Sequence, residues 1–182
     1  MRIIAGQYRS RKLKFPKTKA VRPAMDRVRE TIFNIIGDEI IGARVLDLYA
    51  GCGSIGFEAL SRGAQSAFFV EVHHQAVKCI QENSALLDVK VSITIMQMLV
   101  SRAIPLLHKK GSLFDFIFID PPYGGERAKK TLMKLYRFGI LAPHGKMIIE
   151  HSAHDELALT NEIEVIACKK FGETIVSFLK IQ

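Results

Sequence analysis

The stretch RVLDLYAGCGSIGFEALSRGA, residues 44–64, decides the fold class of this protein. Its apolar run at 44–49 predicts a buried strand, and Gly51, Gly53 and Gly56 follow with the spacing G-x-G-x-x-G. A glycine turn between a strand and a helix brings the backbone close to a bound nucleotide. Asp47 stands four residues before Gly51, inside the apolar run. Because a carboxylate there would repel a pyrophosphate, either the ligand is not a dinucleotide or the glycines only form a tight turn.

The rest of the chain alternates between strand-like and helix-like segments. Apolar strand-like runs lie at 44–49, 66–72, 91–96, 114–120 and 146–150. Helical periodicity fills the gaps at about 54–61, 74–87, 99–109 and 126–138. Repeated strand–helix units predict a doubly wound, mostly parallel sheet. The segments EIEVIACKKFG and ETIVSFLKI at 162–181 have only a glycine turn between them, which predicts an antiparallel pair at the end of a seven-stranded sheet.

The N-terminal segment carries the whole net charge of the chain. Residues 1–30 hold ten of the 26 Lys and Arg residues but only two of the 18 Asp and Glu residues, and the net charge is +8. Clustered positive charge of this kind favours binding to a phosphate backbone, and a merely solubilising tail is the alternative. Alternating segments at 2–5 and 12–15 predict a hairpin, and helical spacing predicts a helix from Pro23 that ends at Gly37. We therefore expect a basic arm or hairpin at 1–22 and an α/β domain at 23–182.

Composition narrows the class of protein. Hydrophobic residues make up 48% of the chain, as in globular proteins, and no apolar run is long enough to span a membrane. The three cysteines, Cys52, Cys79 and Cys168, are too few and too scattered for a disulfide framework or a zinc site. The sequence thus predicts a cytoplasmic protein with no metal and no membrane partner.

The two acidic residues near the glycine turn indicate the ligand. Asp47 would attract a ligand that bears an ammonium group, and S-adenosyl-L-methionine carries both an ammonium and a sulfonium. Glu71 ends the second strand, twenty residues after Gly51, where an acid can accept hydrogen bonds from ribose hydroxyls. Gly51 and Gly53 would let the backbone approach the ligand. The alternative is that Asp47 caps its own turn and Glu71 is a solvated strand end.

A second motif, Asp120-Pro121-Pro122-Tyr123, follows the strand-like run at 114–120. Each proline removes an amide donor and stiffens the chain, which leaves the Asp120 carboxylate and the Pro121 carbonyl as acceptors. Two fixed acceptors can orient the exocyclic amine of a nucleobase, and Asp120 can receive its proton after methylation. Tyr123 offers a ring for stacking a flipped base. The alternative is a rigid strand-to-helix turn.

Taken together, these motifs resemble the RsmD family of bacterial 16S ribosomal RNA guanine-N2 methyltransferases. The similarity lies in RPAMDRVRETIFNII at 22–36, DLYAGCGSIGFEALSRGA at 47–64, FVE at 69–71, FIDPPY at 118–123 and FGETIVSFL at 171–179. The resemblance covers nearly the whole chain. It implies a Rossmann-like methyltransferase fold, S-adenosyl-L-methionine as the cofactor, and a monomer acting on 16S ribosomal RNA or on an assembly intermediate of the small subunit.

The resemblance also assigns the site residues. The expected cofactor-binding residues are Asp47, Tyr49, Ala50, Gly51, Gly53, Glu71, Val72, Gln97 and Met98. Gln97 stands near the position where the family tends to carry an aspartate beside the adenine. The expected catalytic and base-binding residues are Asp120, Pro121, Pro122 and Tyr123. From the clustered charge of the N-terminal segment, the basic residues expected to bind RNA are Arg9, Arg11, Lys12, Lys14, Arg22, Arg27 and Arg29.

Three other functions are compatible with parts of this pattern. A DNA adenine-N6 methyltransferase shares the Asp-Pro-Pro-Tyr motif, although such enzymes usually carry an added target-recognition domain. A protein-glutamine methyltransferase would have Asn in place of Asp120. A nucleic-acid-binding module on a vestigial Rossmann-like core would not bind S-adenosyl-L-methionine, so cofactor binding separates it from the enzymes.

Overall fold

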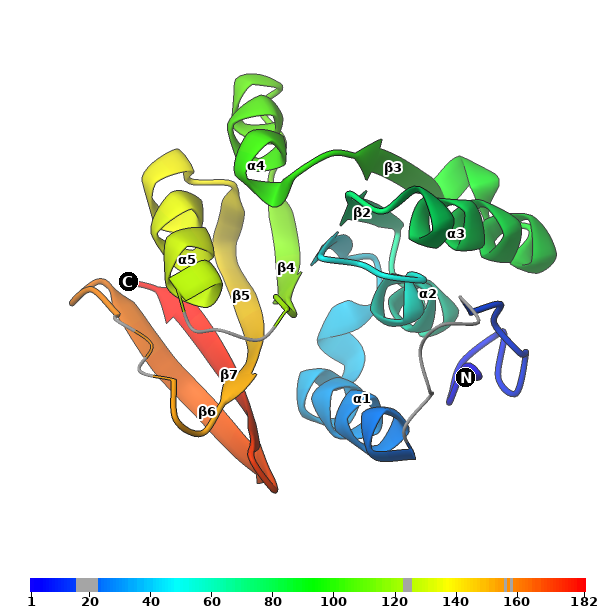
Figure 1. Ribbon diagram of the computed structural model, residues 1–182, viewed down its shortest axis with the longest axis horizontal. Coiled ribbons are helices and arrows are strands. Elements are labelled where there is room, and N and C mark those ends of the chain that lie inside the picture. The colour runs from blue at the N-terminus through cyan, green and yellow to red at the C-terminus, as the bar shows by residue number, and fades with distance from the viewer. Residues whose placement is uncertain (16–22, 123–125, 156, 158) are drawn as a thin grey trace.

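A computed structural model describes residues 1–15, 23–122, 126–155, 157 and 159–182, with the backbone alone for 23–25. The described residues form a seven-stranded sheet in the order β3-β2-β1-β4-β5-β7-β6 (Figure 1). Neighbouring strands from β3 to β5 are parallel, whereas β7 is antiparallel to both β5 and β6. The predicted Rossmann-like α/β fold and the antiparallel C-terminal pair are both confirmed.

The strands are β1 (Arg44–Leu48), β2 (Ser66–Glu71), β3 (Ile93–Gln97), β4 (Phe114–Ile119), β5 (Leu141–Ser152), β6 (Ile163–Phe171) and β7 (Thr174–Ile181). The helices are α1 (Pro23–Ile36), α2 (Ser54–Ser61), α3 (His74–Leu87), α4 (Val100–Lys109) and α5 (Glu126–Phe138), with short 3-10 turns η1 (Gly37–Ile40) and η2 (Lys90–Ser92). The helix predicted from Pro23 ends at Ile36, as expected, because Gly37 takes a positive φ of 57°.

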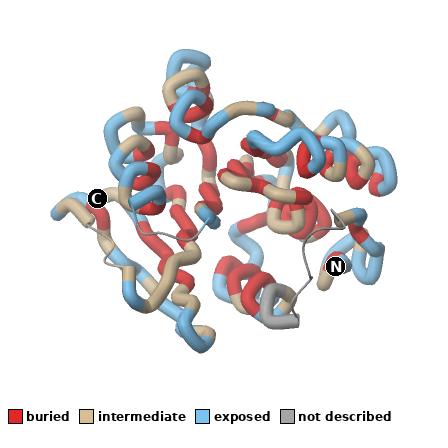
Figure 2. The backbone as a smooth tube through the Cα atoms, in the orientation of Figure 1, coloured by how far each residue is buried: buried red, intermediate tan, exposed pale blue. Residues whose placement is uncertain are grey.

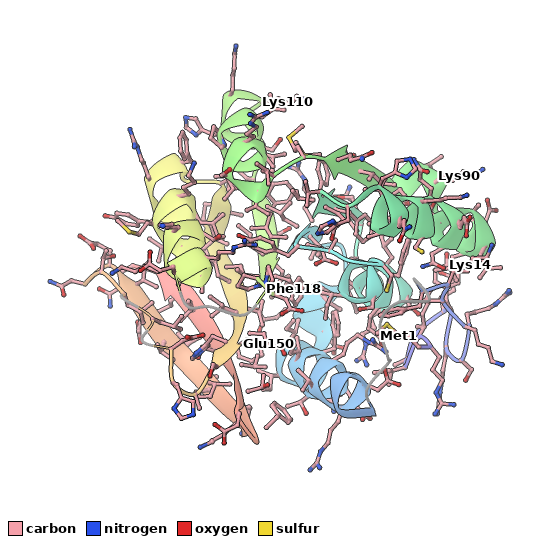
Figure 3. All side chains as sticks on the ribbon, in the orientation of Figure 1. Met1, Lys14, Lys90, Lys110, Phe118 and Glu150 are labelled. Atoms are coloured by element: carbon pink, nitrogen blue, oxygen red, sulfur yellow. The ribbon has the colours of Figure 1, made fainter. Side chains whose placement is uncertain are left out.

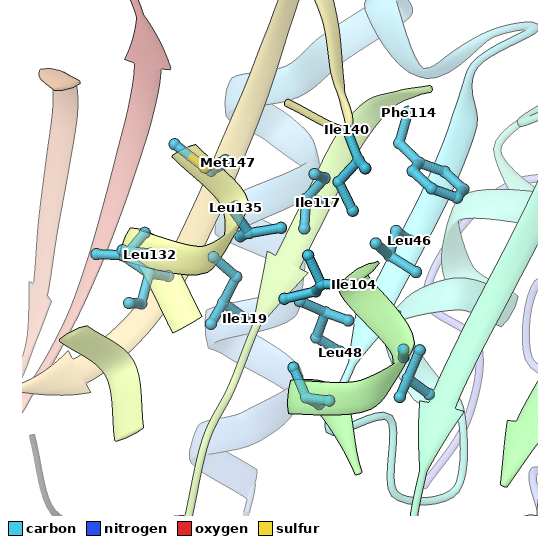
Figure 4. Close-up of a cluster of buried hydrophobic side chains, with 14 of the residues drawn as sticks. Leu46, Leu48, Ile104, Phe114, Ile117, Ile119, Leu132, Leu135, Ile140 and Met147 are labelled. Atoms are coloured by element: carbon cyan, nitrogen blue, oxygen red, sulfur yellow. The ribbon is translucent and has the colours of Figure 1, made fainter. Parts of the chain in front are cut away.

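Two layers of helices bury opposite faces of the sheet. Helices α4 and α5 cover one face, and Figure 4 shows Leu46, Ile117 and Ile119 packed there against Ile104 and Leu132, among other residues. Helix α1 covers the other face, where Val28, Phe33 and Ile36 pack against strand residues such as Phe118 and Ile148. Buried residues line the strands and the inner sides of the helices in Figure 2. The period of two along each strand thus assigns alternate side chains to different helix layers.

Strand order is the main feature that the sequence pattern left open. The last strand of the chain, β7, lies between β5 and β6. Strand β5 is also longer than the expected run at 146–150, since it spans Leu141–Ser152 and pairs with β7 through its second half. Strand β3 begins at Ile93 because η2 occupies the three residues before it.

The basic N-terminal hairpin packs onto the α/β domain. Arg2 and Lys12 form an antiparallel bridge, and Ile3 and Leu13 are buried in a cluster with residues of α2, α3 and β2. The Glu58 carboxylate on α2 accepts hydrogen bonds from the amides of Ile4 and Ala5, at 2.8 and 3.0 Å. The described part of the hairpin therefore shares its core with the domain instead of extending into solvent.

Candidate functional site

Polar acceptors line up where the parallel strands end. Strand register aligns Leu48 with Val70 and with Ile119, and it aligns Ile119 with Ile149. The residues one step further along are Glu71, Asp120 and Glu150, and Glu71 itself is aligned with Gln97. Ligands of open α/β sheets bind beyond the carboxyl ends of the strands. Four acceptor side chains from four strands therefore stand at one level of the ligand-binding end.

Asp47 lies on β1, two residues before the level at which Glu71, Asp120 and Glu150 stand, and it is 4% exposed. Its Oδ2 accepts a hydrogen bond of 3.1 Å from the amide of Gly56 in the first turn of α2. Burial is the main cause that raises the pKa of Asp47 to about 8; the Gly56 amide lowers it, and the nearby charges of Asp120 and Glu71 raise it further. A cationic ligand would relieve this concentration of negative charge. The site thus fits the ammonium and sulfonium of S-adenosylmethionine better than a pyrophosphate.

Glu71 is 7% exposed, so it is not a solvated strand end. Its Oε2 accepts a 2.8 Å hydrogen bond from the amide of Gly51, and its Oε1 accepts from the amides of Val72 and His73 at 2.7 and 2.8 Å. The carboxylate therefore fixes the glycine turn after β1 against the end of β2. Carboxylate oxygens have further lone pairs, which leaves Glu71 able to accept from a ribose hydroxyl as well.

The three glycine positions of the turn lack a side chain for different physical reasons. Gly51 has a φ of +57°, and a Cβ built there would meet no atom within 4 Å, so the space beside it is open for a ligand. Gly53 has a φ of +80°, but its Cβ would come within 2.8 Å of Phe57 and 2.9 Å of Phe69. A Cβ on Gly56 would come within 2.3 Å of Phe69. Aromatic packing between α2 and β2 therefore requires a glycine at position 53 whether or not a ligand approaches it.

The other expected cofactor residues surround this turn in different ways. Tyr49 takes a positive φ of 64°, and its hydroxyl lies 2.7 Å from Thr131 Oγ1 on α5, so its side chain points toward that helix. Ala50 is buried. Val72 is 44% exposed although it is apolar, and Met98 is partly buried after β3. Val72 therefore offers an apolar contact surface next to Glu71.

The second motif begins at Asp120, directly after β4. Asp120 is exposed, Pro121 is half-buried and Pro122 is exposed, whereas Tyr123 lies outside the described residues. The residue before a proline is held extended, so Asp120 continues the alternation of β4 and points to the same side of the sheet as Phe118. Asp47 on β1 points to that side too, and the charge of Asp120 acts on it. The structure therefore brings the two motifs together at one end of the sheet.

The described basic residues expected to bind RNA lie on the hairpin and on α1, and all but Arg29 are exposed. Arg9, Arg11, Lys12 and Arg27 are exposed, and Lys14 is exposed but forms a 3.1 Å ion pair with Glu82. Arg22 lies outside the described residues. A groove of about 550 Å³ runs between the hairpin and α1, and its lining includes Arg2, Arg9, Arg27, Asp26 and Glu30. An exposed cationic surface is thus present on this side of the molecule.

Arg29 requires a correction, because it is 2% exposed and cannot face RNA in this arrangement. Its Nη2 donates to the carbonyl of Arg2 at 2.7 Å and to Asp26 at 3.1 Å, and its Nε lies 3.5 Å from Glu58 Oε2. Glu58 itself is 0% exposed and also pairs with Arg62 at 2.8 Å. Arg29 and Glu58 form a buried ionic link between α1, α2 and the hairpin.

Sequence reasoning missed three residues near the site. Glu58 and Asn83 have no sequence signal that sets them apart from other helix positions. Asn83 joins the hairpin to the glycine turn by donating to the carbonyls of Lys14 and Cys52, at 3.1 and 3.2 Å. Glu150 ends the apolar run at 146–150. A usable signal was present there, since an acidic residue ends the apolar runs of β2, β4 and β5 alike.

Two negative findings concern the described residues. Within them, no group of three His, Cys, Asp or Glu side chains is arranged to hold a metal ion. None of the helices in this part of the chain has the length and apolarity needed to cross a membrane.

Several known proteins similar to this chain are named as methyltransferases, in agreement with the geometry of the site. A family described as conserved hypothetical protein 95 matches residues 1–180. The Bacillus subtilis protein named "Putative rRNA methyltransferase YlbH" is 33% identical over 181 residues, covering 99% of this chain and 98% of the relative. The Escherichia coli ribosomal RNA small subunit methyltransferase D is 35% identical over 157 residues, covering 86% and 77%. A solved Escherichia coli structure titled "Putative methyltransferase yhhF" covers 100% of this chain and 98% of its own, with a TM-score of 0.87 and 28% identity. The chain therefore belongs to the family described as conserved hypothetical protein 95, which is the RsmD family that its motifs resemble.

Proposed function

We propose that this protein transfers a methyl group from S-adenosylmethionine to the exocyclic N2 amine of a guanine in small-subunit ribosomal RNA. Membership of the family makes it an S-adenosylmethionine-dependent methyltransferase of ribosomal RNA. The observation that carries the choice of an amine target is the position of Asp120 and Pro121 beside Asp47, at the carboxyl ends of the adjacent strands β4 and β1. The hydrogen-bond acceptors for an amine thus lie next to an anionic pocket for the cationic cofactor.

Different residues of the site would bind the cofactor and the target base. Asp47 and Glu71 would hold the ammonium and the ribose of the cofactor, with Gly51 giving it room and Val72 and Gln97 lying near its adenine. The cofactor, when bound, supplies an electrophilic methyl group on its sulfonium sulfur, and S-adenosylhomocysteine is the leaving group when the bond from sulfur to that methyl group breaks. Asp120 and the Pro121 carbonyl would each accept one N–H of the target amine, which directs the nitrogen lone pair away from them. As the new C–N bond forms, the amine loses a proton, and Asp120 is its acceptor.

Tyr123 and the hairpin would hold the RNA. The Tyr123 ring would stack on the flipped base, since it directly follows the acceptors in sequence. The exposed residues Arg9, Arg11, Lys12 and Arg27 would contact phosphates, together with Lys14 and Arg22. In this proposal residues 1–22 form the RNA-contacting part, and the protein acts as a monomer, without a metal, on 16S ribosomal RNA or on an assembly intermediate of the small subunit.

Analysis of methylated nucleosides tests this proposal directly. The protein is incubated with labelled S-adenosylmethionine and with RNA or small subunits from a strain that lacks the enzyme, and the products are digested to nucleosides. We expect N2-methylguanosine with the wild-type protein and with the exposed-residue control Asp38→Ala, and none with Asp120→Ala. N6-methyladenosine would support the rival adenine-N6 activity, and unlabelled RNA would exclude both.

A further inference from the structure

Glu150 occupies a position in the site that the two motifs do not account for. Strand β5 is parallel to β4, with Ile149 aligned with Ile119 and Ile148 with Phe118. The next residues of the two strands are Glu150 and Asp120. By the alternation of side chains, both point to the face on which Phe118 and Ile148 lie. Figure 3 labels Glu150 close to Phe118, on the side of the sheet toward α1.

Among the described residues, no cation is found to lower the pKa of Glu150. Its cross-strand partner on β7 is Val176, which is buried and apolar. The neighbouring His151 points to the other side, where its Nε2 lies 3.0 Å from Ser177 Oγ. Burial is the main cause that raises the pKa of Glu150 to about 7, and the charge of Asp120 raises it further. Glu150 is thus a half-buried carboxyl group held beside Asp120, where a hydrogen-bond donor from a ligand would stabilise its charged form.

We propose that Glu150 accepts a hydrogen bond from the N1–H of the target guanine and thereby selects guanine over bases that lack this donor. The inference rests on the proposed function and extends it, because it assigns the choice of base to a residue outside both motifs. Glu150 is in this view a specificity-determining residue. Asp120 remains the group that receives the proton.

The chemistry of the bases supports this assignment. The Watson–Crick edge of guanine presents adjacent donors, the N1–H and the N2 amine, so three acceptors at one end of the sheet can bind them without conflict. Adenine presents one amine beside N1, which carries a lone pair and no hydrogen. Above the Glu150 pKa of about 7, that lone pair would face a carboxylate, and two acceptors opposite each other with no hydrogen between them are strongly unfavourable. The row of Pro121, Asp120 and Glu150 therefore complements guanine better than adenine.

A base analogue isolates the proposed contact. 2-Aminopurine keeps the amine at the position of N2 but has a lone pair in place of the N1–H. The methylated guanine is first mapped with the wild-type protein, and RNA with 2-aminopurine at that position is then prepared. At about pH 8.5, where Glu150 with its pKa of about 7 is ionised, we expect wild-type kcat/KM to be at least about 100-fold lower on the analogue than on guanine. Equal methylation of both RNAs by the wild-type protein would overturn the proposed role of Glu150, even before a variant is tested.

The variant Glu150→Gln replaces an acceptor oxygen with an amide that can turn its N–H₂ toward N1. We expect its kcat/KM on guanine to fall about 10- to 100-fold and its preference for guanine over 2-aminopurine to shrink by at least about tenfold. Titration with S-adenosylhomocysteine should give the wild-type affinity. The control Glu164→Gln, at a half-exposed position on β6 that is ion-paired with Lys180, should behave as wild type. A Glu150→Gln protein that keeps the wild-type preference would overturn the proposal.

Failure of the proposed function gives a different result. If the wild-type protein forms no N2-methylguanosine in any ribosomal RNA, both proposals fall together. If it forms N2-methylguanosine and the preference for guanine is unaffected by Glu150→Gln, only the role of Glu150 falls.

Discussion

The carboxylate of Glu71 accepts a hydrogen bond of 2.8 Å from the amide of Gly51, and this contact joins the end of β2 to the turn after β1. The other oxygen of the same carboxylate holds the amides of Val72 and His73. A residue expected to bind the cofactor is therefore also the residue that shapes the loop around it. Positioning and binding share one side chain, so variants at Glu71 should affect both.

Glu71→Ala should lower the thermal stability and the cofactor affinity together. Three backbone amides lose their acceptor, and each poorly solvated donor left unpaired costs about 1–3 kcal/mol. Glu71→Gln keeps one carbonyl oxygen and should be less damaging. Thermal melts and calorimetric titration with S-adenosylhomocysteine measure the two effects, with the exposed Glu162→Ala as control. Wild-type stability in Glu71→Ala would contradict the loop-fixing role.

Asp47→Asn should stabilise the cofactor-free protein at alkaline pH. The folded-state pKa of Asp47 is raised from 3.8 to about 8, so the folded state holds a proton that the unfolded state has lost over this range. Stability from this group is present below about pH 4 and is lost as the pH rises to about 8. Asn cannot ionise, and its oxygen can still accept from the Gly56 amide.

The difference in stability between Asp47→Asn and wild type should therefore grow with pH, to on the order of 1–3 kcal/mol near pH 8. This corresponds to roughly 2–4 °C in Tm for each kcal/mol. Melting curves from pH 5 to pH 9 measure it. The affinity for cationic S-adenosylmethionine should fall in the same variant. Parallel Tm curves for the two proteins would show that Asp47 does not titrate in this range.

Glu58→Gln should loosen the hairpin and destabilise the whole protein. The change removes the buried counter-charge of the Arg29 guanidinium and leaves it only the partly exposed Asp26, and breaking a buried ion pair costs about 3–5 kcal/mol. The surface pair between Lys14 and Glu82 is the matched control, because Glu82→Gln should cost less than about 1 kcal/mol. Urea denaturation gives both free energies of unfolding. Equal values for the two variants would mean that the link between α1, α2 and the hairpin is not a stabilising one.

Arg9→Gln with Arg11→Gln should weaken RNA binding and flatten its salt dependence. Each phosphate contact that is lost should reduce the log–log slope of affinity against salt by roughly 0.7–0.9. The control removes the same number of charges from exposed positions on β6, Lys169 and Lys170. Both proteins should bind S-adenosylhomocysteine as wild type does. Identical slopes for the two double variants would indicate that the hairpin is a solubilising segment and not an RNA contact.

Much of the site could be inferred from local sequence because its parts are local motifs. Asp47 and Asp120 each lie in or directly after an apolar strand, and parallel strands must end at the same side of a sheet. The role of Gly53 could not be inferred, since the Phe69 ring that excludes a side chain there comes from another strand. The prediction that Arg29 contacts RNA was wrong for the same reason, because its burial depends on Glu58 in a different helix.

By itself, the sequence determined the alternating elements, the glycine turn, the acceptor motif and the family, because periodicity and motif spacing act within short segments. Only the tertiary structure decided that β7 lies between β5 and β6, that the basic hairpin shares the core of the domain, and that Glu150 stands beside Asp120. Each of these depends on contacts between residues far apart in the chain. Strand pairing and burial create such contacts, and a local hydrophobic pattern does not specify which partner a buried face will meet.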